Sequence, residues 1–104
     1  MPARPPRAVT KAQLIERIAA ETGITRTETR TVIEGLAALV TDRVSAGESV
    51  EIRGFGTFRP RQLAARLMPD PRTGRLVEVP PRTVPVFRPA EGFRQAVEEA
   101  GREG

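Results

Sequence analysis

The sequence predicts an α+β fold with the element order helix, helix, three strands, helix. Apolar residues recur at helical spacing in the first half of the chain and switch to strict alternation from Ser49. Glycines able to end a helix stand between these segments. A stretch rich in proline and arginine follows, and it carries a turn sequence between two extended segments. Such a stretch is typical of a long antiparallel hairpin.

The first helix is predicted over residues 11–22. Thr10 and Gln13 form a capping box, in which each side chain satisfies a backbone N–H of the other residue at the helix start. Gly23 then supplies the left-handed residue at which many helices end. The apolar positions at helical spacing are Leu14, Ile15, Ile18 and Ala19.

A second helix follows after a link of about three residues. Thr25 and Glu28 form the next capping box, and Gly47 is the next stop. Together the two helices make an αα-hairpin. The apolar stripe of the second helix is wider than the first helix alone can cover, which leaves room for a partner chain. Its members are Val32, Ile33, Leu36, Ala37, Leu39, Val40 and Val44.

Alternation from Ser49 predicts a strand that continues through the pentad at residues 54–58, whose glycines allow a bend or a close backbone approach. Extended structure restarts after a turn near residue 72. Pro80 and Pro81 interrupt it, because proline cannot donate to a strand ladder. A last strand covers Val84 to Phe87. Pro89 is expected in the first turn of a short closing helix.

The positive charge is concentrated in one segment. Residues 59–88 carry seven arginines against Asp70 and Glu78, a formal charge of +5, whereas the whole chain carries +4. If residues 61–71 run outward and 72–80 return, the tip lies roughly 30 Å from the base. A compact domain of this length has a radius of gyration of about 13 Å, so most of this arm cannot lie over its own core. A basic arm of this kind favours a polyanion as ligand, and DNA is the commonest long one.

The composition argues against several other functions. The chain has 104 residues, no His and no Cys, and neither Ser45 nor Ser49 has a base partner, so an enzyme is not expected. Cofactors, a small-molecule substrate and a metal site are not expected either. The longest apolar run is too short to cross a bilayer, and residues 1–9 lack the apolar block of a secretion signal. The expected location is the cytoplasm.

Several motifs resemble the bacterial HU and integration host factor family of nucleoid proteins. They are the helix start at residues 10–15, the Gly-Phe-Gly-Thr-Phe pentad at 54–58, the Pro71-x-Thr73-Gly74 turn and Val84-Pro85-x-Phe87, and with the closing helix they cover about residues 9–99 in order. The resemblance implies an intertwined homodimer or heterodimer with a three-stranded antiparallel sheet, binding double-stranded DNA in the nucleoid. Each subunit would place a β-ribbon arm in the minor groove and bend or compact the duplex with little sequence specificity.

Site residues follow from the same resemblance. Pro71 would be the wedge between base pairs, although prolines in turns also serve conformation alone. Arg66, Arg72 and Arg75 would line the arm, and Arg59, Arg61 and Arg82 would bind phosphates near its base. Leu36, Leu39, Phe55, Phe58 and Phe87 would fill the dimer core. Stacking of the phenylalanines on single-stranded bases is the alternative, and their apolar, alternating context favours packing.

The chain departs from the family pattern on the arm. Leu63 and Pro69 stand where basic residues are expected, and Asp70 replaces the asparagine before the wedge. Leu67 and Met68 replace small or polar residues. Asp70 places a negative charge near phosphates, which should weaken binding at the tip. Acidic Asp70 and apolar Leu67 and Met68 also favour an alternative function, an assembly module whose arms bind a protein partner or a paralogous subunit.

The expected organisation has three parts. Residues 1–9 form a flexible basic tail, residues 10–99 form the DNA-binding domain with its arm at about 61–80, and residues 100–104 form a flexible end. The apolar content of 38% permits one domain with a modest core, which makes dimerisation the expected route to further burial.

Overall fold

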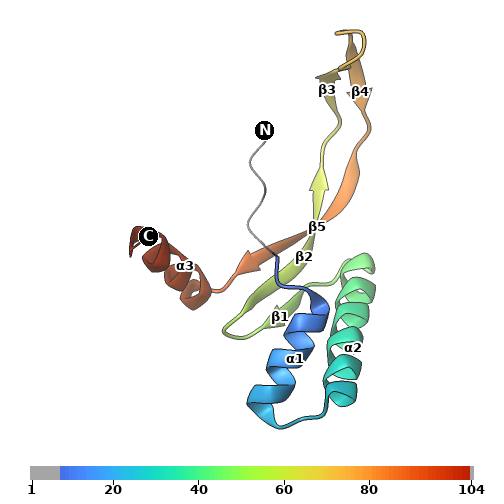
Figure 1. Cartoon of the computed structure of the whole chain (residues 1–104). Helices are drawn as coiled ribbons and strands as arrows, with labels where there is room; N and C mark the ends of the chain where they lie inside the picture. Colours follow the sequence, from blue (N-terminus) through green and yellow to red (C-terminus); the bar gives the residue numbers. More distant parts are fainter. Residues whose placement is uncertain (1–7, 104) are drawn as a thin grey trace. The chain divides into compact units, whose positions relative to one another are not determined.

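A computed structural model of the chain describes residues 8–103 (Figure 1). The elements in order are α1 (Lys11–Thr22), α2 (Arg26–Ser45), β1 (Val50–Ile52), β2 (Gly56–Leu63), β3 (Arg66–Pro69), β4 (Leu76–Val79), β5 (Arg82–Pro89) and α3 (Glu91–Glu103). The predicted α+β class is confirmed. Most of the expected N-terminal tail, residues 1–7, lies outside the described residues. The chain divides into two compact units, one up to Leu39 and one from Val40.

Helix α1 begins and ends where its capping residues predict. The Gln13 backbone N–H donates to Thr10 Oγ1 at 3.2 Å, and the Thr10 N–H donates to Gln13 Oε1 at 3.0 Å. Gly23 follows the helix with φ 80°, and its N–H donates to the Ala19 carbonyl at 3.0 Å. Both ends are therefore determined by local chemistry.

Helix α2 starts after the predicted three-residue link. The Glu28 N–H donates to Thr25 Oγ1 at 3.1 Å, and the buried Thr29 hydroxyl donates to the Thr25 carbonyl at 2.8 Å. Lys11 Nζ lies 2.7 Å from Glu34 Oε2, so an ion pair joins α1 to α2. Hydrogen bonding and the positive charge of Lys11 lower the pKa of the Glu34 carboxyl.

The three-stranded sheet has the antiparallel order β1-β2-β5. The predicted continuous strand through residues 54–58 is wrong, because the chain turns between β1 and β2. The Phe55 N–H donates to the Ile52 carbonyl at 2.9 Å, and Gly54 has φ 81°, a conformation that favours glycine. Gly56 provides the close approach, since a Cβ there would lie 2.5 Å from the Arg88 carbonyl oxygen.

Three further expectations need correction. The expected three-stranded antiparallel sheet is confirmed, but residues 8–103 contain five strands rather than the three expected along the chain, because the turn after Ile52 and a gap in the arm divide the predicted ones. Pro89 ends β5 opposite Gly56 and does not lie in the helix, whose first bond runs from the Arg94 N–H to the Ala90 carbonyl. Residues 100–103, expected as a flexible end, continue α3 to Glu103.

The outgoing and returning chain segments pair in two stretches. We call the pairing of β2 with β5 the proximal ribbon, and residues 66–79, which contain the pair β3 and β4, the distal hairpin. The proximal ladder ends at the pair Leu63 and Arg82, and the distal ladder resumes at Arg66 and Val79. Each strand therefore contributes two unpaired residues to the gap. They are Ala64 and Ala65 on one strand and Pro80 and Pro81 on the other.

Proline positions explain why the ladder breaks there. Pro60 lies opposite Pro85 in β2–β5, and two residues without N–H groups can only form a non-hydrogen-bonded pair. Pro69 opposite Leu76 imposes the same condition on the distal hairpin, where the Asp70 N–H donates to the Arg75 carbonyl at 2.8 Å. The hydrogen-bonded pairs of the proximal ribbon therefore involve the odd-numbered residues of β2, whereas those of the distal hairpin involve the even-numbered residues of β3. The two ladders are out of phase and cannot join without a gap.

An aromatic cluster lies at the base of the proximal ribbon. The Phe87 ring centroid is 4.7 Å from that of Phe58 and 5.1 Å from that of Phe55, and Phe93 of α3 stacks on Phe55 at 5.6 Å. Such pairs add to the free energy of burial. In the single chain Phe87 nevertheless remains 38% exposed, so one subunit leaves this cluster partly uncovered.

Candidate nucleic-acid interface

Arginines collect on one face of the proximal ribbon. Directly opposed residues of an antiparallel pair share a face, and every second residue returns to it. Arg59 faces Val86, Arg61 faces Val84, and Arg82 faces Leu63, so these three arginines belong to the same face. Arg88, opposite Thr57, completes the set. All four side chains are exposed. This arginine face is defined here as Arg59, Arg61, Arg82 and Arg88.

The opposite face of the same ribbon is apolar toward its base and becomes polar only at the outermost pair, Gln62 and Thr83. Phe58 and Phe87 are cross-strand partners on it, followed outward by Pro60 and Pro85. Charge and aromatic rings are therefore separated by the alternation of the strands. One face is suited to a polyanion, and the other is suited to packing against protein.

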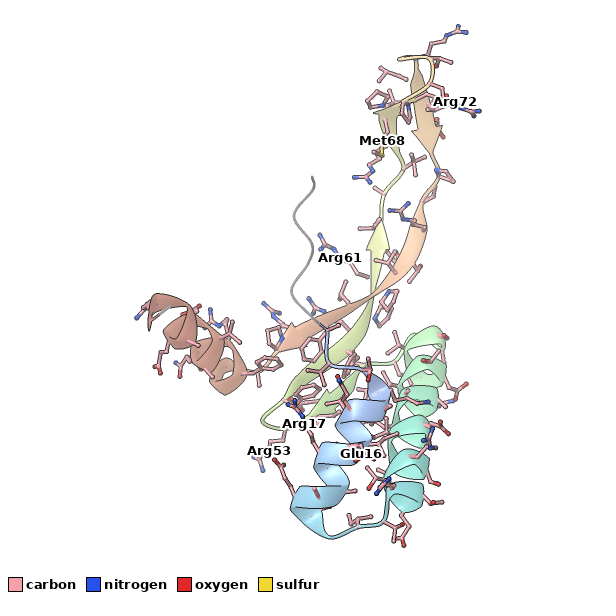
Figure 2. The ribbon with its side chains drawn as sticks, viewed as in Figure 1. Glu16, Arg17, Arg53, Arg61, Met68 and Arg72 are labelled. Atoms are coloured by element: carbon pink, nitrogen blue, oxygen red, sulfur yellow. The ribbon has the colours of Figure 1, made fainter. Side chains whose placement is uncertain are left out.

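The distal hairpin continues the basic character without a core of its own (Figure 2). Arg66 lies on β3, Arg72 lies in the tip turn and Arg75 precedes β4, and all three are exposed. Large apolar side chains here are also open to solvent, with Leu67 63% and Leu76 65% exposed. Met68 and Val77 pair across the strands and are exposed as well.

The tip turn is organised by Asp70 and Gly74. Asp70 Oδ1 accepts the Arg72 N–H at 2.9 Å, and the Asp70 carbonyl accepts the Gly74 N–H at 2.7 Å. Gly74 has φ 73°, which favours glycine. The Arg75 N–H donates to Thr73 Oγ1 at 3.3 Å. These bonds hold Pro71, which is exposed, at the end of the arm.

Among the described residues, the arm and ribbon arginines have no acidic partners. Within residues 8–103, the ion pairs use Lys11, Arg26 and Arg43 as their cations. The guanidinium groups of the arginine face and of the distal hairpin are thus available to an external anion. Their fork of N–H donors matches phosphate oxygens.

Most predicted site residues occupy positions consistent with one extended surface. The structure brings Arg59, Arg61 and Arg82 together, whereas Arg66, Pro71, Arg72 and Arg75 are spread along the distal hairpin. The arginine that sequence reasoning left out of the site is Arg88. Its signal is the even spacing from Arg82, which places both residues on one face once β5 is known to run from Arg82 to Pro89.

The described part of the chain lacks two further kinds of feature. No group of three or more acidic side chains in residues 8–103 is placed to hold a metal ion. No helix among these residues has the length and apolar content needed to cross a membrane.

The fold and this surface define a class, an α+β protein that offers a basic two-stranded arm to a polyanion. The bacterial DNA-binding protein family matches residues 9–98, and the chain belongs to that family. The resemblance inferred from the motifs is therefore confirmed.

Individual relatives cover nearly the whole chain. DNA-binding protein HU of Thermotoga maritima is 33% identical over 89 residues, which are 86% of this chain and 99% of that protein. Integration host factor subunit alpha of Cereibacter sphaeroides is 34% identical over 96 residues, covering 92% of this chain and 96% of that protein. The Anabaena HU–DNA cocrystal structure superposes with a TM-score of 0.81 at 30% identity, over 85% of this chain and 96% of the other.

Proposed function

We propose that two copies of this chain form a dimer that binds double-stranded DNA with its arms in the minor groove and bends it with little sequence specificity. The observation that carries the proposal is the sorting of side chains on the proximal ribbon, with unpaired arginines on one face and aromatic rings on the other. Similarity to a DNA-bound HU structure supports DNA as the polyanion.

Dimer formation accounts for the apolar surface that a single chain leaves open. Val32, Leu36 and Leu39 recur at helical spacing on α2, and Val32 is 65% exposed. Phe55 and Phe87 are likewise exposed at the base of the proximal ribbon. Large apolar side chains exposed on each of these two elements are typical of surfaces that pack against another chain. Leu36, Leu39, Phe55, Phe58 and Phe87 are the proposed dimer core.

DNA binding in this proposal is mainly electrostatic. Arg59, Arg61, Arg82 and Arg88 neutralise phosphates beside the sheet, and Arg66, Arg72 and Arg75 do so along the arm, with release of counterions. Minor-groove edges distinguish little beyond A·T from G·C, so sequence readout is weak. The absence of acidic partners within residues 8–103 leaves each guanidinium free for these contacts.

Bending follows from Pro71 at the tip. An apolar wedge inserted between base pairs unstacks them and kinks the duplex. Bending 20–30 base pairs by 40–90° costs on the order of 1–6 kcal/mol, which additional phosphate contacts along the bent duplex offset. Duplexes that are already flexible should therefore bind best. The place of action is the nucleoid in the cytoplasm, since that is where the DNA is.

The test is affinity for nicked and intact duplexes of one sequence between 50 and 200 mM salt. If the dimer neutralises about 6–10 phosphates, affinity should fall by about 10³ to 10⁵ across this range. The nicked duplex should bind more tightly at every salt concentration. A flat salt response with equal affinities would contradict DNA bending and favour the alternative in which the arms bind a protein.

A further inference from the structure

The Asp70 side chain lies beside the proposed wedge and presents unusual chemistry for a DNA-contacting position. Its Oδ1 atom is committed to the Arg72 N–H at 2.9 Å, which orders the turn. Within residues 8–103, Oδ2 has no hydrogen-bond partner. Asparagine at this position could make the same Oδ1 bond but would present an NH₂ donor as its second group. Aspartate presents an acceptor instead.

The minor groove treats a donor and an acceptor differently. Every base pair offers acceptors there, adenine N3 and thymine O2 among them, but only guanine offers a donor, its N2 amino group. A carboxylate oxygen at the groove floor is repelled by the acceptors and is satisfied by the guanine amino group. Because Oδ1 is already bound, the choice of base rests on Oδ2.

From this geometry we infer that Asp70 makes the arm tip select base-pair steps that carry a guanine amino group in the minor groove. Asp70 is thus a specificity-determining residue in a protein whose other contacts are mostly to phosphates. The inference rests on the proposed function, since it needs the tip to enter the minor groove at Pro71. Selection is confined to the steps next to the wedge, so specificity over the rest of the site stays low.

Inosine provides a test, because it differs from guanine only by lacking the N2 amino group. Two nicked duplexes of one sequence are compared, with guanine or with inosine at the pairs flanking the nick. Wild-type protein should bind the guanine duplex about tenfold more tightly, the typical cost of one wrong base pair being about 1–3 kcal/mol. The direction is informative, because inosine pairs are weaker and easier to deform, which by itself favours the inosine duplex.

Two variants separate selection from general charge effects. Asp70→Asn keeps an oxygen for the Arg72 N–H but replaces the second acceptor by a donor, and it should abolish or reverse the preference for guanine. Glu78→Gln removes the same charge from β4, at a residue paired with Leu67 rather than at the tip. It should raise affinity for both duplexes and leave their ratio near tenfold.

The outcomes also separate this inference from the proposed function. The end-to-end distance of each labelled duplex is measured by energy transfer in the same samples. A ratio of one in wild type, or the same ratio in Asp70→Asn, would overturn the selection while bending persists. Loss of bending on every duplex would overturn the proposed function together with the inference.

Discussion

The proximal ribbon and the distal hairpin are made by the same two chain segments but are stabilised very differently. The proximal ribbon has one apolar face, on which Phe58 and Phe87 lie in contact with Phe55 and Phe93. In the distal hairpin every residue of β3 is exposed, and of β4 only Val79 is half-buried. An isolated two-stranded ribbon is marginal in water. The comparison teaches that the apolar base carries the stability of the ribbon, whereas the distal hairpin has no apolar face of its own to stabilise it.

The largest expected effect is on the stability of the base. Phe87→Ala should lower the free energy of unfolding by about 3–5 kcal/mol, because it removes a ring that contacts Phe55, Phe58 and Phe93. Chemical denaturation at fixed protein concentration measures this. Leu67→Ala is the matched control on the distal hairpin, and it should change stability by less than about 0.5 kcal/mol. Equal effects would mean that the hairpin packs as firmly as the base.

Arm charge should control the salt dependence of DNA binding. Arg72→Ala with Arg75→Ala should lower the slope of log affinity against log salt by about 1 per lost phosphate contact, hence by up to about 4 per dimer. Titrations at four salt concentrations measure the slope. The control is Arg26→Ala with Arg102→Ala, which removes the same charge outside the arm. An unchanged slope in the arm variant would place the phosphate contacts on the proximal ribbon alone.

Pro71 should affect bending more than affinity. Pro71→Ala should leave non-specific affinity within about twofold and reduce the bend, since the phosphate contacts remain while the wedge is lost. Energy transfer between the ends of a labelled duplex reports the change. Pro69→Ala serves as control, because this proline lies in β3 rather than in the tip turn. A bend that survives Pro71→Ala would leave this proline with a conformational role only.

The smallest expected effect concerns the ion pair between α1 and α2. Lys11 lowers the pKa of Glu34 below its usual 4.5 in the folded protein. A lowered folded pKa contributes stability above the unfolded pKa, and this contribution is lost as pH falls through the folded value. Wild type should therefore lose slightly more thermal stability than Lys11→Ala when the pH drops from 6 to below 4.5. If the melting temperatures of the two proteins fell by the same amount over this pH range, the ion pair between Lys11 and Glu34 would make no contribution to stability.

Local signals in the sequence predicted the helices well. Thr10, Gln13 and Gly23 cap α1 through hydrogen bonds to residues within or next to the helix. The ends of α1 could therefore be predicted without knowledge of the rest of the chain. The turn at Gly54 was missed for the opposite reason. Phe58 stays in phase with the alternating Val50 and Ile52, so the apolar pattern runs on past the turn, and the pairing of Val50 with Phe58 shows that the chain has reversed.

Features that depend on register were beyond reach of the sequence pattern. The common face of Arg59 and Arg88 requires two strands to be aligned, and so does the opposition of Pro60 and Pro85. Pro89 was placed in a helix because proline favours first turns, whereas pairing with Gly56 assigns it to β5. The sequence composition was enough to predict that the site is basic and lies on the arm. The division of the arm into two separate strand ladders could not be predicted from it.

The mismatch in phase between the two ladders also affects how copies of this protein can meet. A long, flat ribbon with open edges invites another strand to add to it, and such edges are a route to aggregation. Here the prolines at 60, 69, 80, 81 and 85 remove edge donors and divide the ribbon into segments of eight and four residues per strand. Short, interrupted edges give an incoming strand little to pair with. The same break that loosens the arm thus protects a concentrated protein from self-association through its strands.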